Sequence, residues 1–194
     1  MTSFDDNYQT GAPPWDIGHA QDEFVRLEDA HEIRGKVLDV GCGTGENALF
    51  LASHGHGVVG VDSAPTAIRM AQEKAADRKL SVDFRVGDAR ELDRLGLAFD
   101  TAIDSGLFHT FSDEDRVEFA SSLHGALAPG GTYFVMCFNE REPSDWDGPR
   151  RVSQKDLRAT FGLGWHINYI REAHFEAHRV GSTGHAWLAS ITRS

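Results

Sequence analysis

The feature that most constrains the fold is a glycine-rich turn set between two apolar segments. Residues 37–55 read VLDVGCGTGENALFLASHG, with glycines at three alternate positions, Gly41, Gly43 and Gly45. Lys36–Val40 in front of the turn has the pattern of a buried strand, and Glu46–His54 behind it has that of a helix packed on the strand. A run of glycines lets a ligand approach the backbone closely. The segment therefore predicts a strand–turn–helix unit that binds a ligand at the turn.

Strand and helix patterns alternate along the rest of the chain. They follow in this order: Gly57–Val61 (strand), Ala64–Arg78 (helix), Ser81–Val86 (strand), Ala98–Ile103 (strand), Asp113–Leu127 (helix) and Thr132–Phe138 (strand). Strands joined by helix-length connections run parallel, with helices on both faces. After a short helix at Asp156–Phe161, the extended segments Trp165–Ala177 and Ala186–Thr192 flank the hairpin-like link VGSTGH. We expect a single-domain α/β fold, a Rossmann-like seven-stranded, mostly parallel sheet with an antiparallel C-terminal hairpin.

Charge and composition narrow the class of partner. The formal net charge is −11, so the chain repels phosphate backbones, and its basic residues are scattered apart from Arg150–Arg151. No apolar run is long enough to span a bilayer, and the polar, acidic N-terminus is unlike a targeting peptide. Cys42 and Cys137 make no disulfide framework. We expect a cytoplasmic protein that acts on a small molecule, without a nucleic-acid or membrane partner; the oligomeric state stays open.

The spacing of the glycines helps to identify the ligand. A dinucleotide turn reads G-x-G-x-x-G or A, whereas here the position that should be small is Glu46, and no G-K-[ST] of a phosphate-binding loop follows. Asp62 ends the second strand about 20 residues on, where an acid can accept both hydroxyls of a ribose. Asp88 ends the third strand and can accept from an exocyclic amine. The pattern favours an adenosine with a short attachment, with a purely structural turn as the alternative.

Five motifs in this order resemble the class I S-adenosylmethionine-dependent methyltransferases over nearly the whole chain. They are VLDVGCGTG (37–45), GVD (60–62), GDA (87–89), FDTAIDSGLFH (99–109) and LAPGG (127–131). The resemblance implies S-adenosylmethionine as cofactor and S-adenosylhomocysteine as product. It places the ribose hydroxyls at Asp62, the adenine amine at Asp88 and the methionine ammonium near Asp39. The full set of implied cofactor contacts is Trp15, Asp39, Gly41, Gly43, Gly45, Asp62, Ser63, Asp88, Ala89, Asp104 and Ser105.

Two further segments resemble narrower groups. YQTGAPPWDIGHAQ (8–21) is similar to the lid of thiopurine S-methyltransferase-like enzymes and of thiol or halide methyltransferases, in which the tryptophan closes over the cofactor. An alternative for Trp15 is an aromatic residue that merely packs on the core. GPRRVSQKDLRATFGLGWHI (148–167) is similar to actinobacterial enzymes that methylate quinones, quinolones or other heterocycles. Within the single domain 1–194 we therefore expect three parts: a lid and helix (1–32, the helix at Ala20–Glu32), a cofactor-binding core (33–138), and a substrate-side loop, short helix and hairpin (139–194).

The candidate catalytic residues follow from what methyl transfer requires. The protein must align nucleophile, methyl and sulfur, and a base is needed only when the acceptor keeps its proton at neutral pH. His109, in DSGLFHTF, is the leading candidate for this base, with pocket or lid packing as its alternative role, and Asp16 is the second candidate. The candidate substrate contacts are Phe108 and, for an anionic acceptor oxygen, Arg150 and Arg151.

Two other functional classes fit the sequence less well. His174 and His178 lie in an extended segment, where four residues span roughly 13 Å, so we expect no metal site there. DSGLF lacks the [DN]-P-P-[YF] turn of methyltransferases that act on adenine or glutamine amides. We predict methyl transfer to an O, N or S nucleophile of a small aromatic or heterocyclic molecule, in detoxification or secondary metabolism. The alternatives are a thiol- or halide-type methyltransferase, a non-catalytic cofactor-binding subunit and a nicotinamide-dependent oxidoreductase.

Overall fold

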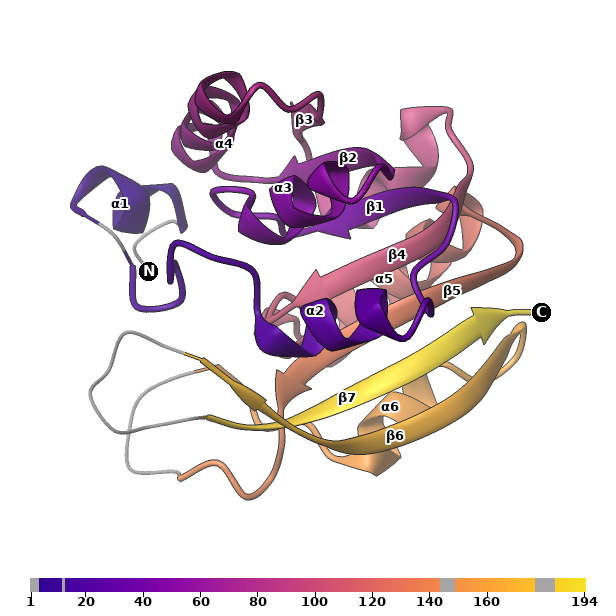
Figure 1. Ribbon diagram of the computed structural model, residues 1–194. Helices are drawn as coiled ribbons and strands as arrows, with labels where there is room; N and C mark the ends of the chain where they lie inside the picture. Colours follow the sequence, from indigo (N-terminus) through magenta and orange to yellow (C-terminus); the bar gives the residue numbers. More distant parts are fainter. Residues whose placement is uncertain (1–3, 12, 144–148, 177–183) are drawn as a thin grey trace.

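A seven-stranded mixed sheet forms the centre of the protein, with strand order β3-β2-β1-β4-β5-β7-β6 (Figure 1). The computed structural model describes residues 4–11, 13–143, 149–176 and 184–194. β1 to β5 pair in parallel, and β7 pairs antiparallel with both β5 and β6. This confirms the predicted fold class. The strands are β1 Lys36–Val40, β2 Gly57–Asp62, β3 Asp83–Val86, β4 Phe99–Ser105, β5 Leu127–Phe138, β6 Trp165–Phe175 and β7 Gly184–Arg193.

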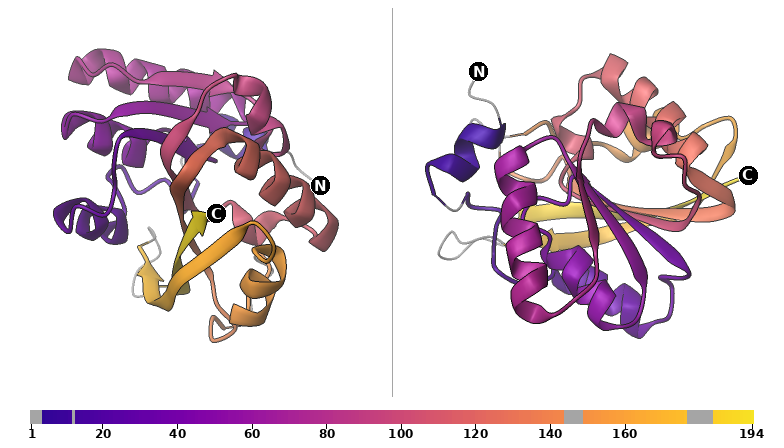
Figure 2. Two further views of the ribbon diagram at one scale, coloured as in Figure 1. Left: turned by 90° about the vertical axis from the view of Figure 1, so that its right-hand side faces the viewer. Right: turned by 90° about the horizontal axis from the view of Figure 1, so that it is seen from above.

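Helices cover both faces of this sheet (Figure 2). They are α1 Phe4–Gln9, α2 Asp22–Asp29, α3 Glu46–Ser53, α4 Pro65–Arg78, α5 Asp113–Ala126 and α6 Gln154–Thr160, with short 3₁₀ helices η1 Ala89–Leu95 and η2 Phe108–Thr110. One apolar cluster joins α5 and α6 to the sheet through Phe119 and Leu157. A second joins α2 and α3 to the other face through Phe24 and Leu49. Among the described residues, no helix has the length and apolar character needed to cross a membrane.

The predicted element boundaries differ from the structure at the edge strand and at the N-terminus. β3 is shorter than the strand expected over Ser81–Val86 and lies at the edge of the sheet, where Phe84 is buried but Val86 is 54% exposed. The helix expected over Ala20–Glu32 is shorter, and α1 was not anticipated from the sequence. Part of the predicted link VGSTGH lies outside the described residues.

The helices α5 and α6 begin with the same capping pattern. At the start of α5, Ser112 Oγ accepts a hydrogen bond from the backbone N–H of Asp115, whose carboxylate accepts in return from the backbone N–H of Ser112. Ser153 and Asp156 repeat this exchange at the start of α6. A reciprocal cap satisfies two N–H groups that the helix itself leaves unpaired. It thereby fixes where the loop after β4 and the loop after β5 end.

Candidate functional site

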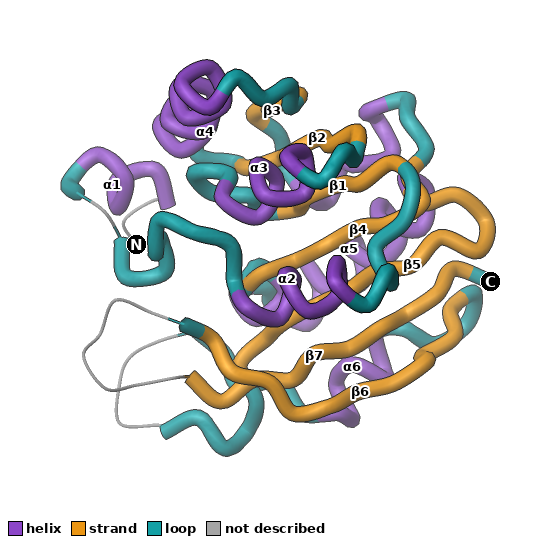
Figure 3. The backbone as a smooth tube through the Cα atoms, in the orientation of Figure 1, coloured by secondary structure: helices purple, strands orange, loops and turns teal. Residues whose placement is uncertain are grey.

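A cavity of about 920 Å³ opens at the edge where the parallel strands end. The chain leaves β1 toward β2 and β3 and returns to the other side of β1 as β4. Such a reversal of strand order leaves a crevice between the loops that follow the two strands. The N-terminal segment with α1 lies beside this edge (Figure 3), and its residues form part of the wall. The ends of β5, β6 and β7 contribute Phe138, Phe175 and Gly184 to the same cavity.

The glycine turn forms the floor of the cavity, and all three glycines have positive φ angles, 70°, 52° and 85°. A Cβ on Gly45 would lie 2.6 Å from the Phe84 ring, and one on Gly43 would lie 2.9 Å from the hydroxyl of Tyr8. Both the backbone conformation and the close neighbours therefore require glycine at these positions. The three glycines line the cavity, so the turn lies where a ligand would bind.

Asp62 lies on the cavity wall with its carboxylate held in a fixed orientation. Its Oδ2 accepts a hydrogen bond from the N–H of Gly43 at 2.8 Å, and its Oδ1 accepts one from the N–H of Ala64 at 2.8 Å. Burial raises the pKa of Asp62. A carboxylate has about four acceptor sites, so each oxygen keeps capacity for one further donor. Two vicinal hydroxyls would fill that capacity. Ser63 follows Asp62 along the same wall.

Two carboxyl groups, Asp39 and Asp104, are buried next to the cavity floor. Asp104 accepts hydrogen bonds from the hydroxyl of Tyr133 at 2.7 Å and from the N–H of Leu107 at 2.7 Å. Asp39 Oδ2 is buried without a hydrogen-bond partner among the described residues. Burial raises the pKa of Asp104 to about 7, and burial together with the charge of Asp104 raises that of Asp39 to about 8. An unpaired buried oxygen is costly, so a cationic ligand group here would be stabilising.

Asp88 also lines the cavity, but an arginine that the sequence analysis did not single out occupies its carboxylate. Arg90 Nη2 lies 2.6 Å from Asp88 Oδ2, and Arg90 Nη1 lies 2.7 Å from Asp115 on α5. The hydrogen bonds from Arg90 lower the pKa of Asp88. The motif GDAR thus links the end of β3 to α5. Ala89, between the two, lines the cavity.

Trp15 holds the N-terminal segment together, and Asp16 attaches that segment to the glycine turn. Trp15 Nε1 donates to the hydroxyl of Tyr8 at 2.9 Å, and the Trp15 side chain remains 47% exposed. Asp16 accepts from Thr44 Oγ1 at 2.9 Å and lies 3.8 Å from Lys74 Nζ. The bond between Asp16 and Thr44 holds the segment against the glycine turn. The carboxylate of Asp16 is engaged in this attachment.

Glu46, the residue that distinguishes this turn from a dinucleotide turn, is buried in an ion-pair network. Its carboxylate accepts from Lys74 Nζ at 2.8 Å and from two nitrogens of Arg78 at 2.8 and 2.9 Å. Burial opposes ionisation, but the hydrogen bonds from Arg78 and Lys74 outweigh it and lower the pKa of Glu46. Because Lys74 also reaches Thr44 at 2.7 Å, the network fixes the end of the turn.

His109 lies at the end of the cavity away from the turn, between aromatic rings. It stacks on Phe138 with 4.7 Å between ring centroids and meets the edge of Phe175 at 5.9 Å. Its Nδ1 accepts a hydrogen bond from the backbone N–H of Phe138 at 3.1 Å. Burial, followed by the charges of Arg151 and Arg116, lowers the pKa of His109 to about 3. His109 is therefore neutral near pH 7.

Phe108 does not reach the cavity. Its side chain is fully buried, with Phe161 at 5.7 Å between ring centroids on one side and the guanidinium of Arg116 at 4.8 Å from its ring. The expected substrate contact from Phe108 is therefore not supported, because η2 turns this side chain into the core while His109 faces the cavity.

Arg150 and Arg151 are likewise turned away from an acceptor. Arg150 Nη2 pairs with Asp113 at 2.8 Å at the start of α5. Arg151 donates to the carbonyl oxygens of Glu142, Pro143 and Pro149. Both guanidinium groups hold loop backbone, and neither residue is part of the described cavity wall. These contacts do not support the expectation that Arg150 and Arg151 bind an anionic acceptor oxygen.

One pair of cavity residues was not recognised in the sequence, His19 and Glu176. His19 Nδ1 lies 2.9 Å from the carbonyl oxygen of Ala20 and 3.6 Å from Glu176 Oε2. Gln21 Oε1 accepts from the backbone N–H of Glu176 at 2.9 Å, and Gln21 Nε2 donates to its carbonyl at 3.0 Å. His19 lies in the segment 8–21 that resembles a lid, so its sequence position could have marked it as a cavity residue. Its partner Glu176 lies far along the chain, where no sequence pattern connects the two.

Histidines and acids elsewhere form no metal site within the part of the chain that the structure describes. His174 faces His185 on β7, with 5.3 Å between ring centroids. His178 lies outside the described residues.

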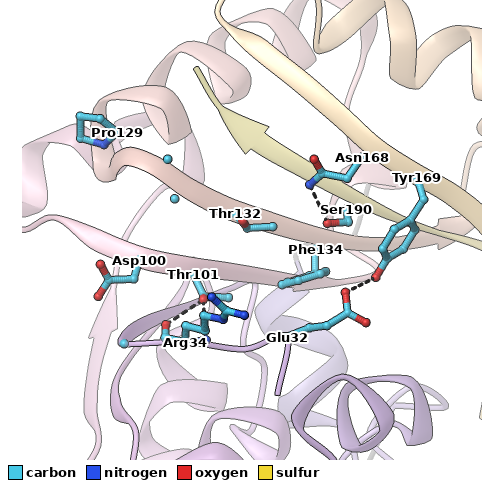
Figure 4. A pocket seen from close by; sticks show the side chains of 13 residues that line it. Glu32, Arg34, Asp100, Thr101, Pro129, Thr132, Phe134, Asn168, Tyr169 and Ser190 are labelled. Atoms are coloured by element: carbon cyan, nitrogen blue, oxygen red, sulfur yellow. Dashed lines mark hydrogen bonds between the residues drawn. The ribbon is translucent and has the colours of Figure 1, made fainter. Parts of the chain in front are cut away.

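A second cavity, of about 660 Å³, lies at the opposite edge of the sheet (Figure 4). Several polar groups on its wall bind one another. Tyr169 donates to Glu32 at 2.9 Å, and Asn168 Nδ2 donates to Ser190 Oγ at 3.0 Å. Thr101 Oγ1 donates to the carbonyl of Arg34 at 2.8 Å. No buried side-chain atom on the described wall of this cavity is left without a partner.

Comparison with known proteins gives a consistent result. The sequence profile described as "Methyltransferase domain" matches residues 37–131. A 2-heptyl-1-hydroxyquinolin-4(1H)-one methyltransferase from Mycobacteroides abscessus is 41% identical, over 87% of this chain and 75% of its own length. A structure from work on the conversion of a disulfide bond into a thioacetal group during echinomycin biosynthesis is 37% identical, with a TM-score of 0.90, covering 98% of this chain and 90% of that chain. Magnesium protoporphyrin IX methyltransferase from Synechocystis PCC 6803 with bound SAM shares the fold, at a TM-score of 0.69, 22% identity and 89% and 77% coverage.

The fold and the cavity are those of an enzyme that binds a nucleoside-derived cofactor at the ends of parallel strands. The chain belongs to the class I S-adenosylmethionine-dependent methyltransferases. The residues present fit this cofactor: Asp62 offers acceptors for the ribose hydroxyls, and the unpaired oxygen of Asp39 suits the methionine ammonium. Asp88 would meet the adenine amine if Arg90 shares its carboxylate.

Proposed function

We propose that this small-molecule methyltransferase transfers the methyl group to an O, N or S nucleophile of an aromatic or heterocyclic acceptor, in detoxification or secondary metabolism. The observation that carries the proposal is the continuity of the cavity. We place the cofactor at the glycine turn and Asp62, and the acceptor beside the aromatic side chains of His109, Phe138 and Phe175, which line the same cavity. Flat rings are bound well by aromatic faces and edges.

The charges of the wall favour an uncharged acceptor. Arg90 is the only lysine or arginine on the described cavity wall, and it already pairs with Asp88 and Asp115. Glu142 and Glu176 bring negative charge to the acceptor end. A phosphorylated or polyanionic acceptor would find no free cation there. A neutral hydroxyl or amine on an apolar ring suits these surroundings better.

The proposed contributions of the two candidate bases differ from those expected from the sequence. When bound, S-adenosylmethionine supplies a methyl group on a positively charged sulfur, so the protein mainly aligns the nucleophile. Because His109 Nδ1 accepts from a backbone N–H, its proton resides on Nε2, and His109 orients the acceptor as a hydrogen-bond donor. Asp16 holds the N-terminal segment on Thr44 and so closes the cavity.

The Mycobacteroides abscessus relative is named for a hydroxyquinolone, which supports a hydroxylated heterocycle as acceptor. The test is to incubate the protein with S-adenosylmethionine carrying a labelled methyl group and a panel of hydroxyquinolones, phenols, thiols and halides. Transfer to hydroxylated rings supports the proposal. Transfer confined to thiols or halides would favour the thiol- or halide-type alternative. Cofactor binding without transfer to any acceptor would favour a non-catalytic subunit.

A further inference from the structure

We propose that His19, with Glu176 beside it, accepts the proton of the methyl acceptor, and that His109 does not. This inference rests on the proposed function, since it concerns an acceptor that keeps its proton at neutral pH. It follows from the hydrogen bonds that the backbone makes to the two histidines of the cavity. Those bonds assign the two rings opposite tautomers.

His109 cannot offer a lone pair to the cavity in this arrangement. A backbone N–H can only donate, so Nδ1 of His109 must hold a lone pair toward Phe138, and the single proton of the neutral ring is on Nε2. That nitrogen lies beside Gly106, where an added Cβ would come within 3.4 Å of it. For Nε2 to accept a proton the ring would first have to lose its own. His109 therefore presents a donor to the cavity.

His19 has the opposite tautomer. A carbonyl oxygen can only accept, so the contact of 2.9 Å between Nδ1 of His19 and the carbonyl of Ala20 places the proton on Nδ1. The lone pair is then on Nε2, which has no hydrogen-bond partner among the described residues. His19 is on the cavity wall and its side chain is 59% exposed, so Nε2 is open to an acceptor and to water.

Glu176 completes the arrangement on the other side of the ring. Its Oε2 lies 3.6 Å from Nδ1 of His19 and is buried without a hydrogen bond. The two hydrogen bonds between Gln21 and the backbone of Glu176 fix the segment that carries this carboxylate relative to His19. A carboxylate next to the Nδ1–H side of an imidazole orients the ring and stabilises the cation that forms when the other nitrogen takes a proton. Glu176 is thus a positioning residue.

The step is balanced with these groups. The acceptor O–H or N–H gives its proton to Nε2 of His19, and the freed electron pair forms the new bond to the methyl carbon. The electron pair of the old carbon–sulfur bond stays on sulfur, which becomes a neutral thioether. The imidazolium of His19, partly exposed, then passes its proton to water. No oxidant, metal or further reactant is needed.

The tautomers can be tested without any acceptor. In protein labelled with ¹⁵N at histidine, the expected spectrum shows His19 protonated at Nδ1 and His109 protonated at Nε2, assigned with His19→Gln and His109→Gln. His166→Gln is the control, because His166 is exposed and lines neither cavity. An Nε2 proton on His19 in the neutral ring would overturn the proposal.

Kinetics test the proton transfer itself, with 4-ethylphenol, which keeps its proton at neutral pH, and 4-nitrophenol, which is largely ionised. His19→Gln should lower kcat about 10²–10⁴-fold for 4-ethylphenol with little change in KM, and should cost little for 4-nitrophenol. Glu176→Gln should lower kcat by a smaller factor, again mainly for 4-ethylphenol. Added imidazole should restore activity to the His19→Ala variant. Equal rates of His19→Gln and wild type on 4-ethylphenol would refute the inference. If the wild-type protein methylates neither phenol nor a hydroxyquinolone, the proposed function fails instead.

Discussion

The two cavities of this protein lie at opposite edges of one sheet and differ in how completely their polar groups are paired. At the carboxyl edge, Asp39 keeps a buried oxygen without a partner among the described residues, and the pKa values of Asp39 and Asp104 are raised by burial. At the opposite edge, Tyr169, Glu32 and their neighbours satisfy one another. The first cavity thus adjoins a buried acceptor without a described partner, whereas no buried side-chain atom on the described wall of the second is unpaired. The pairing of polar groups therefore points to the same cavity as its larger volume does.

The largest effect that separates the two cavities is expected for cofactor affinity. Asp62→Ala removes the acceptors for two hydroxyls, and hydrogen bonds to a charged group contribute about 1.5–3 kcal/mol each. The affinity for S-adenosylhomocysteine should fall by about 10²–10⁴-fold in a calorimetric titration. Glu32→Ala, the matched change in the second cavity, should leave that affinity unaltered. Unchanged affinity for Asp62→Ala, or a comparable loss for Glu32→Ala, would place the cofactor elsewhere.

The second prediction concerns pH. Asp39 has a folded-state pKa of about 8, above that of an unfolded chain, so the folded state binds more protons than the unfolded state between these two values. The contribution of Asp39 to the free energy of unfolding should therefore be fully present below about pH 4 and be lost as pH rises toward 8, by up to about 1.4 kcal/mol per pH unit. Asp39→Asn should reduce the change of the free energy of unfolding with pH, as measured by denaturant unfolding.

Two ligands that differ in their ammonium group provide the control for this pH dependence of stability. S-adenosylhomocysteine carries an ammonium that would sit near Asp39, whereas methylthioadenosine lacks it. The first ligand should stabilise the protein more strongly at pH 8 than at pH 6, and the second should not. An identical pH dependence of stability in wild type and Asp39→Asn would contradict the role given to this buried carboxyl group.

A third comparison uses one glycine from each cavity. Gly45 and Gly130 both have positive φ, 85° and 79°, so alanine costs about 1–2 kcal/mol at either site. At Gly45 the added Cβ also meets the Phe84 ring at 2.6 Å, whereas at Gly130 nothing lies within 4 Å. Gly45→Ala should destabilise by about 1–3 kcal/mol more than Gly130→Ala in urea unfolding. Equal losses of unfolding free energy in the two variants would mean that the turn at Gly45 adjusts to the added Cβ without strain.

The smallest effect is expected at the N-terminal segment. Thr44→Val removes the hydrogen bond to Asp16, which contributes about 0.5–1.5 kcal/mol. Cleavage within residues 8–21 by limited proteolysis should become several-fold faster, and S-adenosylhomocysteine should slow it in both proteins. Thr101→Val, at the second cavity, should leave the cleavage rate unchanged. Cleavage that is insensitive to cofactor would show that the segment only packs on the core.

The fold and the identity of the cofactor were predictable because their signals are local. The turn at Gly41–Gly45 follows directly from strand, glycine spacing and helix, and Asp62 stands at a fixed distance along the chain. The order of the strands follows from the same periodicities. Parallel strands place their loops at one edge whatever the remaining side chains are. Local patterns therefore carry most of the information about the cofactor.

The acceptor end was less predictable because its chemistry depends on contacts between distant segments. Whether His109 is a base or a donor is decided by the backbone of Phe138. Whether Arg150 reaches an acceptor is decided by Asp113, which pairs with it. Glu176 meets His19 only because β6 ends beside the N-terminal segment. Residue type and sequence spacing alone do not predict how these side chains are oriented.

The most direct test of the central claim is an experimental structure with S-adenosylhomocysteine bound. The carboxyl-edge cavity should hold the ligand, with the ribose hydroxyls hydrogen-bonded to Asp62 and the amino group next to Asp39. The second cavity, beside Tyr169, should contain no ligand. A ligand bound at the second cavity, or one in the first cavity that leaves Asp62 and Asp39 without contacts, would contradict the account.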